Sequence, residues 1–264
     1  MDILKRSLAP ISDGAWNEIE EEAERILKGN LSARGIVDFD GPGGWKKAAI
    51  NLGSLKLGKK TPVKGIEWGT REVLPLLELR VPFSLDIWDL DNLERGGQAP
   101  NLDPVAEAAQ KTAQFEEAAV YLGLPEAGFK GICETAATVG LPGDTGGLIP
   151  AFEDAILALQ QQGVAGPYQL VLGTQVYRDV MAGDDKGYPL ARRVKELFGG
   201  DFKWSPAIEG GVVLSRRGGD FLFTCGQDLS IGYHRHDAKK VDLFITESFA
   251  FQVLEPAAAV VLKQ

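Results

Sequence analysis

The stretch LELRVPFSLDI, residues 77–87, carries the most regular pattern in the sequence. Apolar residues occupy every odd position, and charged residues, serine or proline occupy the even positions. A period of two over this length is typical of a β-strand with one buried face. Because Pro82 has no N–H to donate to a sheet ladder, we expect this strand at a sheet edge or in a two-stranded ribbon.

Two helices are expected, one on either side of this strand in the sequence. Residues 12–28 carry apolar side chains at helical spacing and a run of glutamates in the early turns. Residues 103–122 predict a longer helix, with Asp103 as its N-cap and Pro104 at the first helical position. We expect the buried face of this longer helix to consist of Val105, Ala108, Thr112, Phe115, Ala119 and Leu122.

Residues 41–70 have a different composition, rich in glycine and lysine and without apolar periodicity. The segment nevertheless holds two tryptophans and several leucines and isoleucines, which is too apolar for a solvated, disordered tail. We therefore predict a long β-hairpin arm that becomes ordered against another subunit.

Helices and strands alternate beyond residue 128. We find no internal repeat, and we expect Thr174 to cap one of the helices. The expected helices are 150–162, 174–182 and 189–198, and the expected strands are 168–172, 212–215, 221–224 and 241–253.

The composition excludes several classes of partner. The chain has 264 residues and a net charge of −9, so it lacks the concentration of Lys and Arg that nucleic-acid binding requires. We see no apolar run of about 18 residues and no secretory signal, and we expect no membrane partner and a cytoplasmic location. Two cysteines outside any CxxC pair favour a reduced protein.

One short segment, FTCGQDLSIGYHRHD at 223–237, concentrates the residue types that catalysis and metal binding use. Zinc normally takes three or four protein ligands, and the positive charges beside His234 and His236 oppose a cation. We expect both histidines in a solvated turn between two strands, and Cys225 as a buried thiol. Motifs such as GxSxG and GxxxxGK[ST] are missing from the sequence. The sequence therefore predicts no catalytic residue, no metal site and no enzyme.

Seven stretches resemble the encapsulin family, the self-assembling shells of bacterial and archaeal nanocompartments. No single stretch is diagnostic, but together they cover essentially the full length in the family's order. They are LKRSLAPIS at 4–12, VDFDGPGGW at 37–45, LELRVPFSLDIWDLDNLERG at 77–96, GPYQLVLG at 166–173, YPLARRV at 188–194, RRGGDFLFTCGQDLSIGY at 216–233 and LFITESFAFQVLEP at 243–256.

This resemblance implies an α+β fold, that of the tailed-phage major capsid proteins. It also implies that copies of the chain form an icosahedral particle of about 60, 180 or 240 subunits, and a chain this short favours about 60. The family's organisation would divide the chain into an N-terminal lumenal helix and arm (1–44), an extended loop (45–72), a peripheral domain (73–130 and 221–255) and an axial domain (131–220 and 256–264).

The family captures its cargo in a lumenal groove between the N-terminal helix and the strand that corresponds to LSIGY. A short, largely apolar targeting peptide, usually at the C-terminus of a cargo enzyme, docks there and places alternate side chains in small pockets. Without the resemblance, strand core and a local ion pair are the simpler interpretation of these positions. Carried over by position, the cargo-peptide-binding residues are Ile26, Arg34, Ile36 and Asp38 on one side, and Asp228, Leu229, Ile231 and Tyr233 on the other.

Two further sites follow from the resemblance. The loop at Asp184, Asp185 and Lys186 falls where the family places its five-fold pore, and a ring of aspartates would favour cations such as ferrous iron. An ordinary solvated turn is the alternative. Arg80 and Trp88, expected together on the polar face of the strand at 77–87, would be the flavin site that some family members have. An exposed tryptophan is also a common packing anchor between subunits.

We therefore predict a shell protein that encloses a cargo enzyme and admits small molecules through pores. The resemblance implies a ferritin-like protein or a dye-decolourising peroxidase as cargo, and iron storage or defence against oxidative stress as the role. Two alternatives stay open. A prophage capsid protein would share the fold, although packaging DNA calls for a basic interior. A linocin-type bacteriocin or protease activity would need a nucleophile–base pair, which we do not find.

Overall fold

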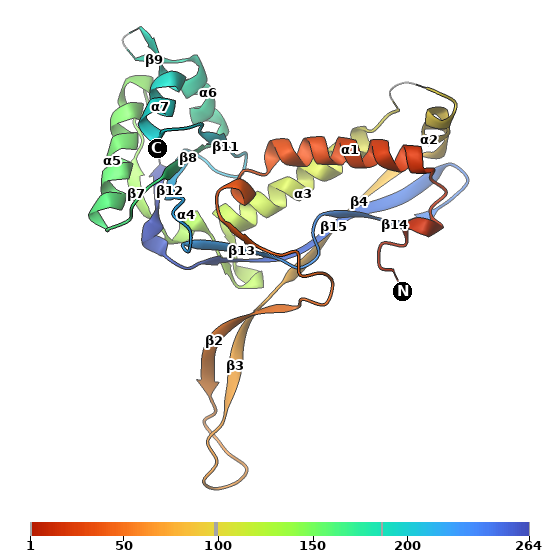
Figure 1. Ribbon diagram of the computed structural model, residues 1–264, viewed down its shortest axis with the longest axis horizontal. Helices are drawn as coiled ribbons and strands as arrows, with labels where there is room; N and C mark the ends of the chain where they lie inside the picture. Colours follow the sequence, from red (N-terminus) through yellow and green to blue (C-terminus); the bar gives the residue numbers. More distant parts are fainter. Residues whose placement is uncertain (1, 98–99, 186, 264) are drawn as a thin grey trace.

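The computed structural model describes residues 2–97, 100–185 and 187–263. Two separate sheets, each covered by helices, form the body of the molecule, and a long two-stranded arm projects away from it (Figure 1). Helices and strands are both abundant, in agreement with the predicted α+β class.

The first sheet is built around one 14-residue strand, β15 (Lys240–Val253). Along one side, β15 pairs antiparallel with β4 (Leu77–Asp86). Along the other side it pairs antiparallel with β14 (Ser230–His236) and β13 (Phe221–Cys225). A short strand, β1 (Asp38–Asp40), extends the sheet by pairing parallel with β13.

The edge strand predicted from LELRVPFSLDI is confirmed as β4. Its residues alternate between buried or half-buried and exposed positions, and Pro82 lies on the exposed face. Within the part of the chain that the structure describes, β4 pairs with β15 alone, so the missing N–H of Pro82 interrupts no second ladder. The strand ends at Asp86, whose carboxylate accepts the backbone N–H of Trp88 at 2.8 Å and caps helix α2 (Ile87–Glu94).

Both predicted helices flanking β4 are confirmed. Helix α3 (Asp103–Tyr121) packs on β4 and β15, and helix α1 (Asp13–Asn30) packs on α3 (Figure 1). Ser12 caps α1 because its hydroxyl oxygen accepts the N–H of Ala15 at 3.2 Å. The apolar side of α1 is buried, so this helix is fixed to the body of the molecule.

The buried face of α3 differs from the prediction. Phe115 and Leu122 are 39% and 51% exposed, whereas Glu116 and Glu117 are fully buried. The pattern of apolar residues misled the prediction because both carboxylates find polar partners inside the protein, as described below. Buried carboxylates are tolerated only when they are paired in this way.

Two predicted helix caps are also wrong. Asp103 is the first residue of α3, and the N-cap position belongs to Leu102, without a side-chain hydrogen bond. Helix α6 (Thr174–Ala182) has Gly173 at its N-cap. The hydroxyl of Thr174 instead accepts the indole N–H of Trp204 at 3.1 Å, which joins α6 to a neighbouring strand.

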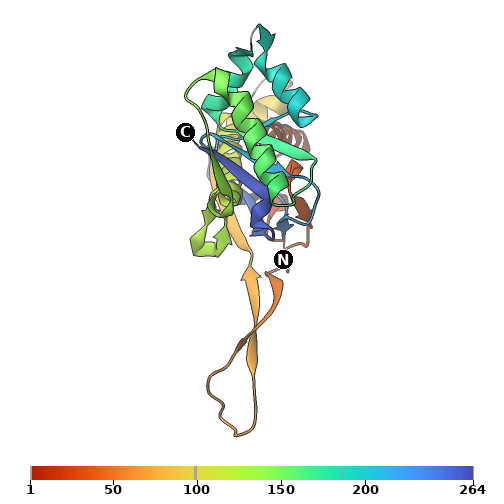
Figure 2. The same cartoon turned by 90° about the vertical axis from the view of Figure 1, so that its left-hand side faces the viewer.

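A second sheet of five strands, in the order β11–β8–β12–β16–β7, lies at the other end of the molecule (Figure 1), and this end faces the viewer in Figure 2. The helices predicted for this region are confirmed within two residues at either end. Its strands are β7 (Ala137–Gly140), β8 (Tyr168–Leu172), β11 (Lys203–Trp204), β12 (Gly211–Ser215) and β16 (Ala259–Lys263), and its helices are α5 (Leu148–Gln161), α6 and α7 (Leu190–Phe198).

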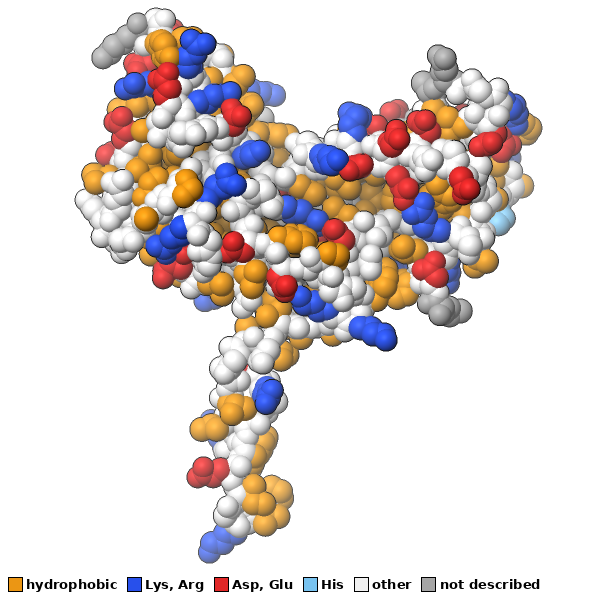
Figure 3. Space-filling model, viewed as in Figure 1, with side chains coloured by type: hydrophobic (Ala, Val, Ile, Leu, Met, Phe, Trp, Pro, Cys, Tyr) orange, Lys and Arg blue, Asp and Glu red, His pale blue; other side chains and the backbone are white. Residues whose placement is uncertain are grey.

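The hairpin predicted within residues 41–70 is confirmed as strands β2 (Ala49–Leu57) and β3 (Gly69–Pro75), joined by a long loop. The arm extends well beyond the body and carries hydrophobic side chains along its length (Figure 3). Leu57 is 74% exposed and Trp68 is 48% exposed. Ordering of this arm against another subunit stays a prediction.

No helix among the described residues is long and apolar enough to cross a bilayer.

Short elements connect these parts. The short elements are the 3-10 helices η1 (Arg6–Leu8), η2 (Ala33–Gly35), η3 (Pro125–Ala127), η4 (Thr145–Gly147) and η5 (Pro256–Ala258), helix α4 (Ile132–Thr135), and the two-residue strands β5 (Gly123–Leu124), β6 (Phe129–Lys130), β9 (Asp184–Asp185) and β10 (Tyr188–Pro189).

The hydrophobic interior consists of two clusters that share α3 and β15. One cluster includes Ala113 of α3 and Ile245 of β15, together with the buried face of α1. The other includes Ala119 of α3 and Phe249 of β15, together with the second sheet. The same helix and the same strand therefore pass from one core into the other.

The buried position of Leu243 on β15 predicts how much stability is lost when its side chain is truncated. Leu243 is fully buried and lies between Phe83 of β4 and Tyr233 of β14. Replacing Leu243 with alanine is expected to cost about 2–5 kcal/mol, because both transfer energy and packing are lost. Leu254, 51% exposed just beyond the same strand, is the matched control. Thermal unfolding of the two alanine variants should show a large decrease for L243A and almost none for L254A; equal decreases would contradict this core.

Candidate functional site: a groove beside the first helix

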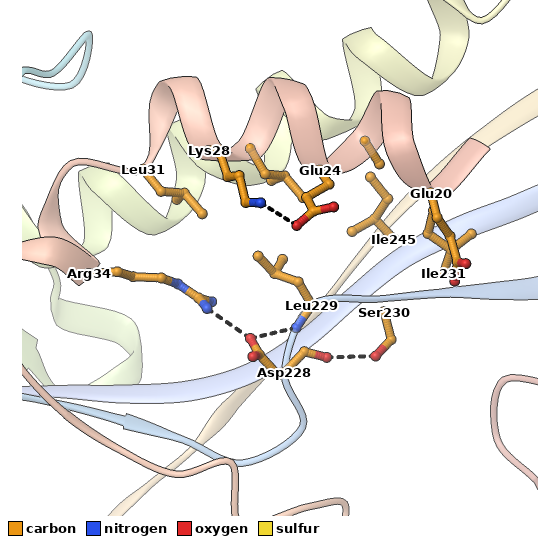
Figure 4. A pocket seen from close by; sticks show the side chains of 12 residues that line it. Glu20, Glu24, Lys28, Leu31, Arg34, Asp228, Leu229, Ser230, Ile231 and Ile245 are labelled. Carbon is orange, nitrogen blue, oxygen red and sulfur yellow. Dashed lines mark hydrogen bonds and ion pairs between the residues drawn. The ribbon is translucent and has the colours of Figure 1, made fainter. Parts of the chain in front are cut away.

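A groove of about 660 Å³ lies between α1 and the beginning of β14 (Figure 4). Helix α1 and the residue after it form one wall, and the segment from Asp228 to Ile231 forms the other. The side chains that line the groove are Glu20, Ala23, Glu24, Leu27, Lys28, Leu31, Arg34, Asp228, Leu229, Ser230, Ile231 and Ile245.

The groove has an apolar floor and a charged margin. Leu31 and Leu229 present hydrophobic side chains toward the space (Figure 4), and Leu27 also lines it. On the helix side, Lys28 forms an ion pair with Glu24. This combination can hold apolar side chains of a peptide on the floor while polar groups at the margin orient its backbone.

Glycine at position 232 keeps the strand wall of the groove in place. A Cβ atom at Gly232 would lie 2.3 Å from the aromatic ring of Phe244 on the neighbouring β15. A larger residue there would have to displace this ring, so glycine leaves room for Phe244 to lie over β14. Ile231, the residue before it, is thereby held at the groove.

Arg34 closes one end of the groove and is paired with three carboxylates. Its Nη1 donates to Asp228 at 2.8 Å, its Nε and Nη2 donate to Glu116 at 2.9 and 2.8 Å, and Nη2 also donates to Glu247. The side chain of Arg34 is 17% exposed, and those of Glu116 and Glu247 are 0% exposed. The turn after α1, helix α3 and strand β15 are thus joined through one guanidinium.

The neighbouring Glu117 is held by neutral donors. It accepts the backbone N–H of Ala33 at 2.8 Å and the hydroxyl of Ser205 at 2.7 Å. The hydroxyl of Ser32 also donates to it, at 2.6 Å. Glu117 therefore fixes the turn that carries Arg34 onto α3.

The electrostatics of this buried cluster shift several pKa values. Burial raises the pKa of Glu247 well above its ordinary value, and the nearby charge of Glu116 raises it further. Burial alone would lower the pKa of Arg34, but hydrogen bonds and charges from Glu116, Glu247 and Asp228 outweigh it and raise that pKa. Burial also raises the pKa of the Cys225 thiol to about 12. Cys225 is therefore a buried, protonated thiol, as predicted.

Four of the eight residues predicted to bind a cargo peptide are brought together by the structure: Arg34, Asp228, Leu229 and Ile231. The sequence analysis missed Ala23 and Leu27 as lining residues, although both follow the helical spacing of the predicted helix, and it missed Leu31, which lies beyond that helix.

The other four predicted residues lie outside the groove lining. Ile26 is half-buried on α1, Ile36 is buried in the core that includes the second sheet, and Asp38 accepts the N–H of Gly219. The hydroxyl of Tyr233 is 2.6 Å from Nδ1 of His236.

The histidines lie at the exposed end of β14, and not in the turn that was predicted. The strand continues through His236, and the turn to β15 follows it. Among the described residues, the one group with geometry suited to a metal ion contains neither histidine. It consists of Cys225, Asp228 and Glu247, whose ligand atoms lie within 4.8 Å of one another.

The predicted flavin pair is separated in the structure. Trp88 belongs to α2 and not to the strand, is 65% exposed and lies under the guanidinium of Arg95, 5.5 Å from the ring centre. Arg80 lies on the exposed face of β4, beside Glu78 and 4.8 Å from the ring centre of Phe244. A small pocket beside Arg80 is lined by Asp2, Ile3 and Lys5, and not by Trp88.

The loop predicted to form a pore is a short hairpin at the tip of the second-sheet region (Figure 1). Asp184 and Asp185 form β9, which pairs with β10. The carboxylate of Asp184 accepts the N–H of Gly187 at 2.9 Å, and Lys186 lies outside the described residues.

Known structures share this fold. A virus-like particle from Pyrococcus furiosus covers 94% of this chain and 98% of its own, with a TM-score of 0.66 and 17% identity. The capsid of Myoviridae phage XM1 covers 89% of this chain and 91% of its own, with a TM-score of 0.57 and 16% identity. These similarities define a capsid-like fold.

Sequence similarity then identifies the family. A family model described as an encapsulating protein for peroxidase matches residues 1–250. The type 1 encapsulin shell protein of Rhodospirillum rubrum is 42% identical over 271 aligned positions, covering 100% of this chain and 97% of the relative. The chain belongs to the encapsulin family of shell proteins, and its relatives are named as structural proteins and not as enzymes.

The ion pairs of Arg34 with buried carboxylates predict that removing its side chain strongly lowers the stability of the protein. In an Arg34→Met variant, two fully buried carboxylates would lose their cation, which is expected to cost about 3–5 kcal/mol. The loss should be smaller in mild acid, because protonation removes the unpaired charge. Arg235→Met is the control, since Arg235 lies on the exposed end of β14 and pairs with Asp242 of β15. Thermal unfolding at several pH values measures both variants, and equal stability of the two would refute the buried cluster.

Proposed function

We propose that this chain assembles into a closed icosahedral shell of about 60 copies and captures a cargo enzyme by binding its C-terminal peptide in the groove beside α1. The observation that carries this proposal is the groove itself, which has an apolar floor of Leu27, Leu31 and Leu229 between a fixed helix and a strand. The full-length similarity to named encapsulin shell proteins supports it.

The groove suits a short extended peptide of mixed character. An extended chain places alternate side chains on one face, and the spaces above Leu229 and Ile231 would receive them. Glu20 and Glu24 lie on the helix side of the groove but are already paired with Arg6 and Lys28, so they attract a basic residue of a peptide only weakly. Arg34 is already paired with three carboxylates, so it is a poor receptor for a peptide carboxylate.

The parts of the chain are assigned roles in the shell according to the domain organisation of the family. Residues 73–130 and 221–255 would form the peripheral domain, and residues 131–220 and 256–264 the axial domain. The arm at 45–72 would cover a neighbouring subunit, which is supported by the exposure of Leu57 and Trp68. Asp184 and Asp185 would line a pore for small cations.

The cargo would supply the chemistry. A peroxidase is supported by the family description, which names an encapsulating protein for peroxidase. A ferritin-like iron-oxidising protein is the other candidate, and the acidic residues at β9 would suit the entry of ferrous iron. Oxidative-stress defence or iron storage would follow from the cargo.

Cargo capture is tested by Leu229→Asp, which places a charge on the apolar floor of the groove. Particles are purified from the native host, the copurifying cargo is identified by mass spectrometry, and its C-terminal tail is fused to a fluorescent protein. Loading of this fusion should decrease roughly tenfold in L229D, because a desolvated carboxylate replaces an apolar contact. Leu254→Asp, outside the groove lining and 51% exposed, should load normally. Equal loading of both variants would remove the groove from the proposal.

Assembly is tested by light scattering on the purified protein, with electron micrographs of the same fraction. A hollow particle of megadalton mass is expected, because closed symmetry multiplies each contact between subunits. Trp68→Asp on the arm should shift the protein toward small species, whereas Arg71→Asp on the same arm tests charge alone. A monomer or dimer for the unmodified chain, stable across salt and pH, is the contrary result.

A further inference from the structure

The cluster at the end of the groove holds more negative than positive charge. Glu116, Glu247 and Asp228 surround the single guanidinium of Arg34, so three ionised carboxylates would leave an excess of two negative charges. Glu116 and Glu247 accept hydrogen bonds from the same nitrogen, Nη2, and both are fully buried. Two carboxylates held this closely, away from water, cannot both be ionised without a large cost.

The groups that face Glu247 leave one oxygen unsatisfied. Within the described ranges, they are Arg34 from the turn after α1, Glu116 from α3, Asp228 before β14 and Cys225 from β13. The β4 residue opposite Glu247 in the sheet is apolar. Oε2 of Glu247 has no hydrogen-bond partner among these residues. An ionised carboxylate in this position would leave a buried acceptor without a donor, whereas a bound proton reduces the excess from two negative charges to one.

A metal ion is a less suitable neutraliser than a proton. Cys225, Asp228 and Glu247 have suitable ligand atoms, but Arg34 already donates to both carboxylates and its positive charge opposes a cation. Burial raises the pKa of the Cys225 thiol to about 12, so a metal ion bound there would first have to displace its proton.

We propose that Glu116 and Glu247 share one proton, and that this proton lets them act as positioning residues that hold Arg34 and Asp228 at the end of the groove. Loss of the proton adds a negative charge beside Asp228. Asp228 is the most exposed of the three carboxylates, at 43%, so it moves toward solvent and the groove end loosens. The effect on peptide binding rests on the proposed function, whereas the shared proton does not.

The proton is tested first by stability, in the assembled particle and without cargo. Because the pKa of Glu247 is raised in the folded state, its contribution to stability is complete below the ordinary pKa and is lost as pH rises through the folded value. The unfolding midpoint of the unmodified protein should therefore decrease by several degrees between about pH 6 and about pH 9. Glu247→Gln, a neutral isostere, should reduce this decrease by at least about half.

Glu107→Gln is the matched control, because Glu107 lies on the same helix as Glu116 with its side chain 70% exposed. It should keep the pH dependence of the unmodified protein. Identical pH profiles for E247Q and E107Q would overturn the proposal. If E247Q does not form particles, Glu116→Gln replaces it, since it removes the other member of the pair.

Infrared titration of the unmodified particle provides a readout that needs no variant to fold. A protonated carboxylic acid has a carbonyl stretch distinct from that of a carboxylate, and this band should persist near neutral pH and disappear in alkali. Its absence at neutral pH would refute the shared proton. Stoichiometric zinc in the purified particle, released together with loss of stability on chelation, would assign the site to a metal instead.

The link to the groove is tested with the fluorescent fusion that carries the cargo tail. Loading should decrease at least about threefold from about pH 6 to about pH 9 in the unmodified shell and remain level in E247Q. A shell that never loads the fusion, but whose infrared band and stability follow the prediction, removes cargo capture and keeps the proton. If the unmodified shell loads the fusion equally well at every pH while the infrared band of the protonated carboxylic acid is present, Glu116 and Glu247 do not act as positioning residues for the groove.

Discussion

A buried line of charge divides the interior of this shell protein, and the rest of the structure depends on how that charge is balanced. Glu116 and Glu117 lie on α3 between Ala113, which belongs to one hydrophobic cluster, and Ala119, which belongs to the other. On β15, Glu247 lies in the same way between Ile245 and Phe249. The carboxylates therefore stand at the boundary between two apolar cores.

One guanidinium and three neutral donors make this boundary tolerable. Arg34 supplies the positive charge, and the turn that carries it also provides Ser32 and Ala33 as donors to Glu117. Burial of charge without such partners would cost several kcal/mol for each group. Because the turn directly follows α1, the same interactions fix the C-terminal end of that helix and with it one wall of the groove.

Local patterns in the sequence predicted the helices and strands, but they did not predict which polar residues are buried. Period-two alternation identified β4 because one face of an edge strand is buried and the other exposed. The buried face of α3 was misjudged because Glu116 and Glu117 look like solvent-facing residues unless Arg34 and Ser32 are known to face them. Those partners are more than 80 residues away in the sequence.

The groove shows the same limit. Arg34, Asp228, Leu229 and Ile231 were found through a family resemblance, and residues near them in sequence were included although the chain turns away from the groove there. Ile36 is an example, since it follows η2 into the core. Leu31 and Ile245 were missed because a groove wall is defined by which elements lie opposite each other, and no periodicity within one segment records this.

The arm of β2 and β3 has a consequence for the life of a newly made chain. A two-stranded ribbon on its own is only marginally stable in water, and this one has unpaired edges and exposed leucines. Before the predicted contact with another copy forms, this ribbon is open to proteases and to wrong strand pairing. The rate of synthesis therefore matters as well as the final structure: slow production prolongs this exposed interval, whereas rapid production shortens it but raises the concentration of competing edges.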